Sequence, residues 1–140
     1  MKNKKDNSAK YLAILSLTGM ILILIYWFTG SMVHSSGTKI GYTDNATRYS
    51  WSAEYESIDG TFTKTIYPKT NPQEIAISAV TEEGNLGILA ECNGEVLFEG
   101  ENLQSGHTHI LADGKVKITI TAEKHKGSFT IGVVDENHTH

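Results

Sequence analysis

Cysteine is almost absent from this 140-residue chain, since Cys92 is the only one. A single cysteine can form no disulfide within the chain, so the fold must be held together by its hydrophobic core. Cys92 shares the parity of Leu86, Ile88 and Ala90 along one expected strand. This pattern indicates a small buried apolar residue rather than a nucleophile.

Short catalytic signatures are also missing. The sequence contains no Gly-x-Ser-x-Gly, no His-Glu-x-x-His and no phosphate-binding glycine loop. A domain of this size with short loops has little room for a deep pocket. We therefore expect no enzymatic activity.

Basic residues are scarce outside the first ten positions. Residues 35–140 hold 8 basic and 15 acidic residues, a net charge of −7. A nucleic-acid-binding protein needs a basic face to neutralise phosphates, and this acidic region offers none. DNA and RNA are therefore excluded as expected partners.

No charged residue occurs from Tyr11 to Val33, and most of this run is apolar. At about 1.5 Å per residue, a helix of this length matches a hydrocarbon layer of roughly 30 Å. Four lysines precede the run, which by the positive-inside rule keeps the N-terminus cytoplasmic. We expect a signal-anchor helix over residues 11–33, with a cleaved signal peptide as the alternative.

The anchor divides the chain into segments. Residues 1–10 form a basic cytoplasmic segment, and residues 34–47 are small and polar, as in a linker, although Ile40 and Tyr42 could dock as a first strand. Residues 48–135 form the extracytoplasmic domain, and residues 136–140 form a tail. The expected location is the cell membrane, crossed once, with the C-terminal domain outside the cytoplasm.

Period-two alternation begins after residue 47. Trp51, Ala53 and Tyr55 fall on one side of a strand, and Val116 and Ile118 begin a second such series. Turn residues that tolerate positive φ, such as Asp59-Gly60, separate the strands. The expected strands are 48–56, 61–67, 74–81, 86–92, 95–98, 107–111, 115–123 and 128–134.

Seven or eight half-buried strands predict an all-β fold. Strands with one buried and one wet face pack as two antiparallel sheets, face to face. The predicted fold class is an antiparallel β-sandwich, Ig-like or jelly-roll-like, preceded by one N-terminal transmembrane helix.

Turns and strand starts carry a resemblance to a known group of proteins. They are the runs 57–62 (SIDGTF), 94–98 (GEVLF), 114–118 (GKVKI) and 126–129 (KGSF). Over residues 48–134 the chain resembles small extracytoplasmic β-sandwich domains of Gram-positive bacterial lipoproteins and anchored proteins. The resemblance implies a sandwich at the cell surface and no functional residues. The chain departs from lipoproteins in having no cysteine directly after its apolar run.

His107-Thr108-His109 is the most specific chemical feature. Residues two apart on a strand share a face, so both imidazoles could bind one metal ion such as Zn²⁺, Cu²⁺ or Ni²⁺. Otherwise they are simply exposed polar residues. The candidate third ligands are His125, Glu101, Asp113, His138 and His140.

Tyr49, Trp51 and Tyr55 are candidates for an aromatic platform that binds sugar rings. The same spacing suits a core strand, which is the favoured interpretation because Ala53 shares that face. The expected function is therefore a non-enzymatic interaction or structural domain at the cell envelope, with a protein partner there. Metal binding and carbohydrate binding are the alternatives, and no cofactor is expected beyond such a Zn²⁺ or Cu²⁺ ion.

Overall fold

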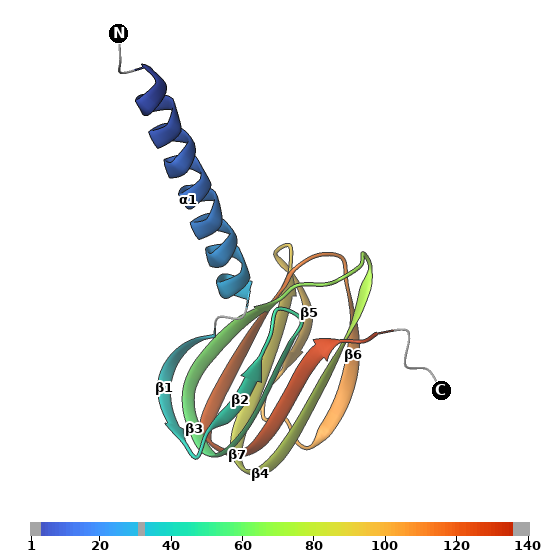
Figure 1. Cartoon of the computed structure of the whole chain (residues 1–140). Coiled ribbons are helices and arrows are strands. Elements are labelled where there is room, and N and C mark those ends of the chain that lie inside the picture. Colours follow the sequence, from blue (N-terminus) through green and yellow to red (C-terminus); the bar gives the residue numbers. More distant parts are fainter. Residues whose placement is uncertain (1–3, 31–32, 136–140) are drawn as a thin grey trace. The chain divides into compact units, whose positions relative to one another are not determined.

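Two compact units make up the chain, residues 1–30 and residues 31–140, and each is described by itself. The computed structural model describes residues 4–30 and 33–135 (Figure 1). The tail predicted over residues 136–140 lies outside the described residues.

The first unit is a single helix, α1, from Lys4 to Gly30. No proline interrupts these 27 residues, and Leu, Ile and Met supply apolar side chains. Residues 20–25 are consecutive, apolar and exposed. No helix within the described residues combines the length and the hydropathy needed to cross a bilayer. The membrane anchor predicted over residues 11–33 stays a prediction, and residues 31 and 32 of it lie outside the described residues.

The second unit is an antiparallel sheet of seven strands in the order β1-β3-β7-β4-β5, with β2 paired to β3 and β6 paired to β4. Every strand pairs with at least one neighbour, so the seven strands form one sheet. Three strands are long and curved (Figure 1). The bounds are β1 His34–Ile40, β2 Thr43–Ala46, β3 Ser50–Ile66, β4 Gln73–Cys92, β5 Glu95–Gly100, β6 Gly106–Ala112 and β7 Val116–Val133.

The long strands β3, β4 and β7 bend at one level of the sheet. Pairing of β3 with β7 shifts register between Tyr55 and Gly60, and pairing of β4 with β7 shifts between Thr81 and Asn85. Positive φ angles occur at these bends, including 132° at Gly60, 78° at Gly84 and 46° at Lys124. Bulges of this kind bend a strand and increase its twist.

The bends fold the sheet into two layers. One layer contains β2, β6 and the adjoining halves of the long strands, and we call it the β2–β6 layer. The other contains β1, β5 and the remaining halves, and we call it the β1–β5 layer. Buried side chains from both layers form one core cluster, so the layers pack face to face as a β-sandwich.

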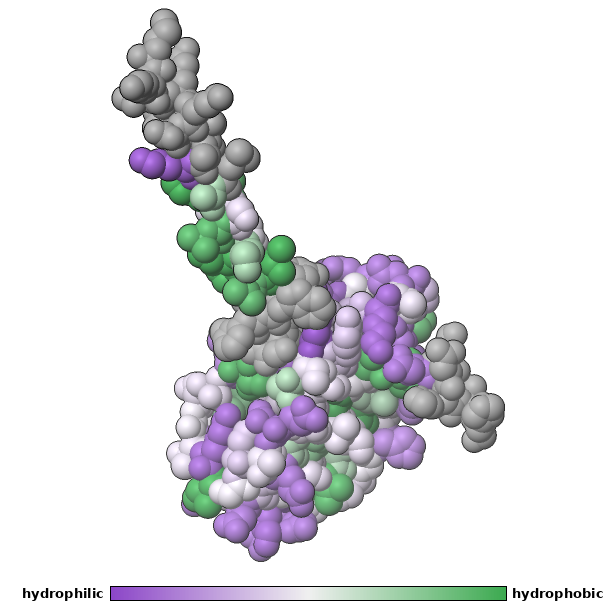
Figure 2. All heavy atoms as spheres, viewed as in Figure 1, coloured by the Kyte–Doolittle hydropathy of each residue, from purple (hydrophilic) through white to green (hydrophobic). Residues whose placement is uncertain are grey.

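Alternation places the core as the sequence predicted. Trp51, Ala53 and Tyr55 are buried in the β2–β6 layer, and Trp51 contacts Phe129 edge to face with ring centroids 4.8 Å apart. Val116 opens the buried series of β7 in the β1–β5 layer. The drawn face of the domain is mostly hydrophilic or intermediate in hydropathy (Figure 2).

Two sequence predictions about connections were wrong. Asp59-Gly60 does not form a hairpin but lies inside β3, because Gly60 bends the strand from one layer to the other. The segment predicted as a linker, residues 34–47, contains β1 and β2, which pair with opposite halves of β3, so the alternative in which Ile40 docks as part of a first strand is the one observed. Their polar composition reflects edge strands whose side chains are mainly exposed. Asn93-Gly94 does form the expected turn between β4 and β5.

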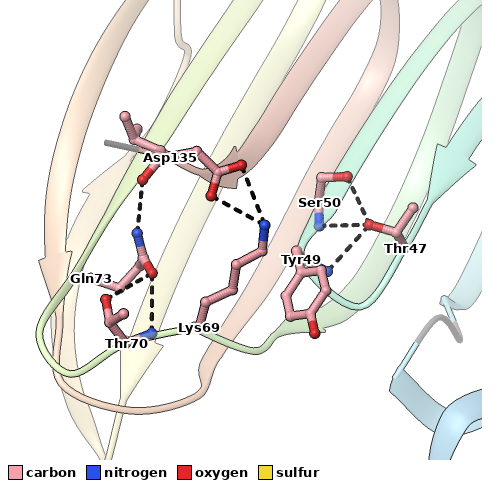
Figure 3. Close-up of polar contacts among 8 residues, drawn as sticks. Thr47, Tyr49, Ser50, Lys69, Thr70, Gln73 and Asp135 are labelled. Carbon is pink, nitrogen blue, oxygen red and sulfur yellow. Dashed lines mark hydrogen bonds and ion pairs between the residues drawn. The ribbon is translucent and has the colours of Figure 1, made fainter. Parts of the chain in front are cut away.

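Polar contacts close one end of the sandwich (Figure 3). Gln73 is buried, and its amide donates to the carbonyl of Val134 over 2.8 Å while its oxygen accepts from Thr70. Lys69 forms an ion pair with Asp135 at 3.1 Å. The connection between β3 and β4 is thereby attached to the end of β7.

The bend at Gly84 gives a stability test. Gly84→Ala is expected to lower the free energy of unfolding by about 2–4 kcal/mol, because a left-handed alanine is strained and its Cβ would overlap the carbonyl oxygen of Lys124. Chemical denaturation measures this. Gly94→Ala is the matched control, with φ of 77° and open space around the added Cβ, and should cost roughly 1 kcal/mol. Equal losses would show that the bend is not crowded.

Candidate functional site

A groove of about 360 Å³ crosses the outer face of the β1–β5 layer. Its floor lies where β4 pairs with β7, with Gly87 opposite Thr121 and Leu89 opposite Thr119. Gly87 has no side chain, which leaves the floor open. The groove is lined by Asn85, Leu86, Gly87, Ile88, Leu89, Glu99, Gly100, Glu101, Asn102, Thr119, Thr121 and Glu123.

The polar groups of the groove are acidic or neutral. Three carboxylates line it, from Glu99, Glu101 and Glu123, and no lysine, arginine or histidine is among the lining residues. The amide of Asn85 donates to Glu123 over 3.4 Å, which holds these two side chains together. The groove therefore offers many hydrogen-bond acceptors, a few donors and no positive charge.

Glu101 and Asn102 form one wall of the groove and begin a short connection, residues 101–105, whose backbone is held on two sides. The amide of Leu103 donates to the carbonyl of Leu86 over 2.8 Å. The hydroxyl of Thr81 donates to the carbonyl of Leu103 over 2.8 Å. Ser105 accepts from the amide of Thr81 at 3.0 Å. These contacts fix the wall against β4.

A buried histidine supports this connection from inside the bend. His125 is fully buried, with Nδ1 2.7 Å from the hydroxyl of Tyr55 and Nε2 2.9 Å from that of Thr81. Because Thr81 donates its proton to Leu103, it accepts from Nε2–H, and Nδ1 accepts from Tyr55. Burial raises the pKa of Tyr55, so its hydroxyl keeps its proton. We call this chain of hydrogen bonds, from Tyr55 through His125 and Thr81 to the carbonyl of Leu103, the buried relay. It gives each ring nitrogen of neutral His125 a hydrogen-bond partner, and burial lowers the pKa of the imidazole.

Of the predicted metal ligands, only His107 and His109 are neighbours within the described residues. His107 and His109 share the outer face of the β2–β6 layer, as predicted, with ring centroids 6.2 Å apart. His125 as a third ligand was wrong, because both its nitrogens are used in the relay. No group of three or more metal-ligating side chains, whether with Glu101 or with Asp113, forms within residues 4–30 and 33–135. His138 and His140 lie outside the described residues.

The aromatic platform is not available to a ligand. Trp51 is 0% exposed and Tyr55 is 5% exposed, which confirms the core interpretation of this strand. Tyr49 is half-buried, and its ring lies 4.9 Å from Nζ of Lys69. Cys92 is also buried, as predicted.

One buried basic side chain was not predicted from the sequence. Lys64 is 1% exposed, its Nζ donates to the carbonyl of Thr65 over 3.0 Å, and burial lowers its pKa to about 8. Parity was the available signal, because Lys64 lies between Phe62 and Ile66 on the buried side of β3. Because Lys64 is buried, a ligand cannot reach its side chain.

A second hollow, of about 400 Å³, lies on the outer face of the β2–β6 layer near the bend. Lys126 and Glu82 both line it and form an ion pair of 3.6 Å. Unlike the groove, this hollow therefore contains a cationic side chain, which is paired with one of its carboxylates.

Comparisons with known proteins identify no family. No family model and no curated protein sequence matches the chain. Three solved structures show limited similarity. TmCBM61 in complex with β-1,4-galactotriose is 16% identical with a TM-score of 0.44, covering 76% of this chain and 90% of its own. PirA is 16% identical with a TM-score of 0.39, covering 64% and 97%.

The third structure is the CBM36-1 domain of a multidomain xylanase from the hindgut metagenome of Trinervitermes trinervoides. It is 13% identical with a TM-score of 0.32, and the alignment covers 74% of this chain and 98% of that domain. At these values the likeness assigns neither a family nor a ligand to the chain.

The buried relay predicts that acid destabilises the fold. The unfolded chain binds a proton at His125 below pH 6.5, whereas folded His125 resists protonation, so stability is lost as the pH falls below 6.5. Replacing His125 by Gln should cost about 1–3 kcal/mol at pH 7.5, because Tyr55 and Thr81 lose a partner. It should also flatten the slope of stability against pH below 6.5, measured by urea unfolding. His34→Gln, on an exposed strand, is the control, and an equal flattening there would contradict the assignment.

Proposed function

We propose that the β-sandwich is a non-catalytic module that binds neutral, hydroxyl-rich glycans in the groove of the β1–β5 layer. The observation that carries this proposal is the lining of the groove, which combines three carboxylates, two amides and two threonine hydroxyls without a cationic side chain. Of the functions that the sequence left open, carbohydrate binding fits this surface best.

Hydrogen-bond complementarity supports a sugar as the ligand. Each sugar hydroxyl is a donor and an acceptor, so it can donate to Glu99 or Glu101 and accept from the amide of Asn102. Hydrogen bonds to ionised carboxylates are shorter and stronger than neutral ones. Anionic ligands are disfavoured, because they would meet carboxylates and no positive charge. The volume of about 360 Å³ lies within the range of ligand sites.

The exposed position of the acidic side chains favours binding over catalysis. Glu99, Glu101 and Glu123 are all solvent exposed. A carboxyl group that acts as a general acid near neutral pH needs a drier environment that raises its pKa. The expected envelope protein partner stays a prediction.

We also propose that α1 attaches the domain to a membrane. The six residues Met20 to Ile25 span more than a full helical turn, so apolar side chains surround the axis, and each is 48–65% exposed. A helix that is apolar on all sides needs an apolar environment. Lipid would provide that environment.

Two double variants on the outer face of the β1–β5 layer, one inside the groove and one outside it, test glycan binding. Thr119→Ala/Thr121→Ala removes two hydroxyls from the groove and should weaken binding at least tenfold, about 1.4 kcal/mol. Thr61→Ala/Thr63→Ala removes their cross-strand partners on β3, outside the groove, and should leave binding unchanged. A glycan array of galactose, mannose, xylose and glucose oligosaccharides, followed by calorimetry on the strongest ligand, measures both.

The array also includes uronic acid oligomers, which should bind more weakly than neutral ones of equal length. A preference for the uronic acids, equal effects of the two threonine pairs, or no binding to any neutral glycan would refute the proposal.

Membrane attachment is tested with the full chain and liposomes. Flotation should carry the unaltered protein with the vesicles, and Leu22→Asp/Leu24→Asp should release most of it, because a charge within a lipid-embedded helix costs about 2–3 kcal/mol or more. Leu111→Asp is the control, since Leu111 is equally exposed, at 64%, but lies on β6. Release by the control variant, or no release by the helix variant, would contradict attachment through α1.

A further inference from the structure

The outer face of the β2–β6 layer carries a second set of chemically specific side chains, away from the groove. Residues of β6 alternate, so Ile110 points into the core while His107 and His109 point outward. Both imidazoles are exposed. Their ring centroids lie 6.2 Å apart, with the ring planes at 82°. Two neighbouring imidazoles on one face are the first requirement for a shared metal ion.

The neighbouring strand supplies a partner that orients one of these rings. Oε1 of Glu74, on β4, lies 2.6 Å from Nδ1 of His109. An ionised carboxylate only accepts hydrogen bonds, so Nδ1 of His109 must carry the proton. Its Nε2 then has a free lone pair when the ring is neutral. A carboxylate that accepts from a histidine in this way is the usual outer partner of a metal-binding imidazole, and it raises the basicity of the ligand.

The distance between the rings is close to what one metal ion requires. With metal–nitrogen bonds of about 2.0–2.1 Å and roughly 1.1 Å from nitrogen to ring centroid, two centroids can lie up to about 6.4 Å apart. A tetrahedral angle at the metal brings them to about 5.2 Å. Rotation of the exposed His107 ring can supply this closure of roughly 1 Å, while Glu74 holds His109 in place.

Small residues keep the space in front of the rings open. His107 pairs with Ser78 across β4, and His109 pairs with Ala76. The next strand continues these rows with Thr130 and Gly132. An ion held by the two histidines would therefore keep several coordination positions open to water.

We propose that His107 and His109, with Glu74 as a positioning residue, form a surface site for a divalent transition-metal ion. Two imidazoles suit Cu²⁺, Ni²⁺ and Zn²⁺ and are poor ligands for Ca²⁺ and Mg²⁺, which prefer oxygen. Cu²⁺ should bind most tightly, following the general order of affinities. The site is independent of the proposed glycan groove, since it lies on the opposite layer.

The test uses the full chain with His138→Ala and His140→Ala as the background, so that the terminal pair cannot contribute. Calorimetry with CuCl₂ and ZnCl₂ alone should give one site, tighter for Cu²⁺. His107→Ala and His109→Ala should each weaken Cu²⁺ binding at least tenfold, and Glu74→Gln should weaken it by about tenfold. His34→Ala, which removes an exposed histidine on β1, should change nothing.

Electron paramagnetic resonance of the Cu²⁺ form gives a second readout. Nitrogen hyperfine structure should indicate two imidazoles in the background protein and one in either single variant. Unchanged affinity in both single variants, or loss of binding in the His34 variant, would overturn the site. Unchanged affinity in Glu74→Gln with loss in the histidine variants would overturn the positioning role alone.

Discussion

The bending of three long strands at one level is the constraint on which the domain depends. Strands of 17, 20 and 18 residues carry one continuous hydrogen-bonded sheet, and only by folding over can that sheet bury its apolar side against itself. Bulges and positive φ angles at the bends make this possible without ending the strands. Burial of one side of the sheet then stabilises the fold through the hydrophobic effect. The chain depends on this burial because its single cysteine can form no disulfide within the chain.

The bend also imposes a polar requirement, which the buried relay satisfies. Backbone pairing is interrupted at the register shifts, and His125 occupies this region with a hydrogen bond on each ring nitrogen. Thr81 accepts a hydrogen bond from His125 and donates one to the carbonyl of Leu103. The relay therefore also positions the connection that forms a wall of the groove. Stability of the bend and shape of the candidate site are therefore linked through Thr81.

Local periodicity was enough to predict the core but not the connections. Alternation correctly placed Trp51 and Tyr55 inside and His107 and His109 on one outer face, because side-chain direction in a strand depends only on parity. Asp59-Gly60 has the composition of a hairpin turn, but the positive φ that Gly60 can adopt also allows a strand to bend without ending. Only the cross-strand register decides between them.

The groove and the Glu74–His109 contact could not be predicted for a related reason. Thr121, Gly87 and Glu101 are far apart in sequence and become neighbours through the pairing of β7 with β4 and of β4 with β5. Glu74 likewise reaches His109 only through the pairing of β4 with β6. The two proposed sites lie on opposite outer faces, with the core between them and no shared side chain. Substitutions at one should therefore add to those at the other without coupling, because separated sites with no common partner act independently.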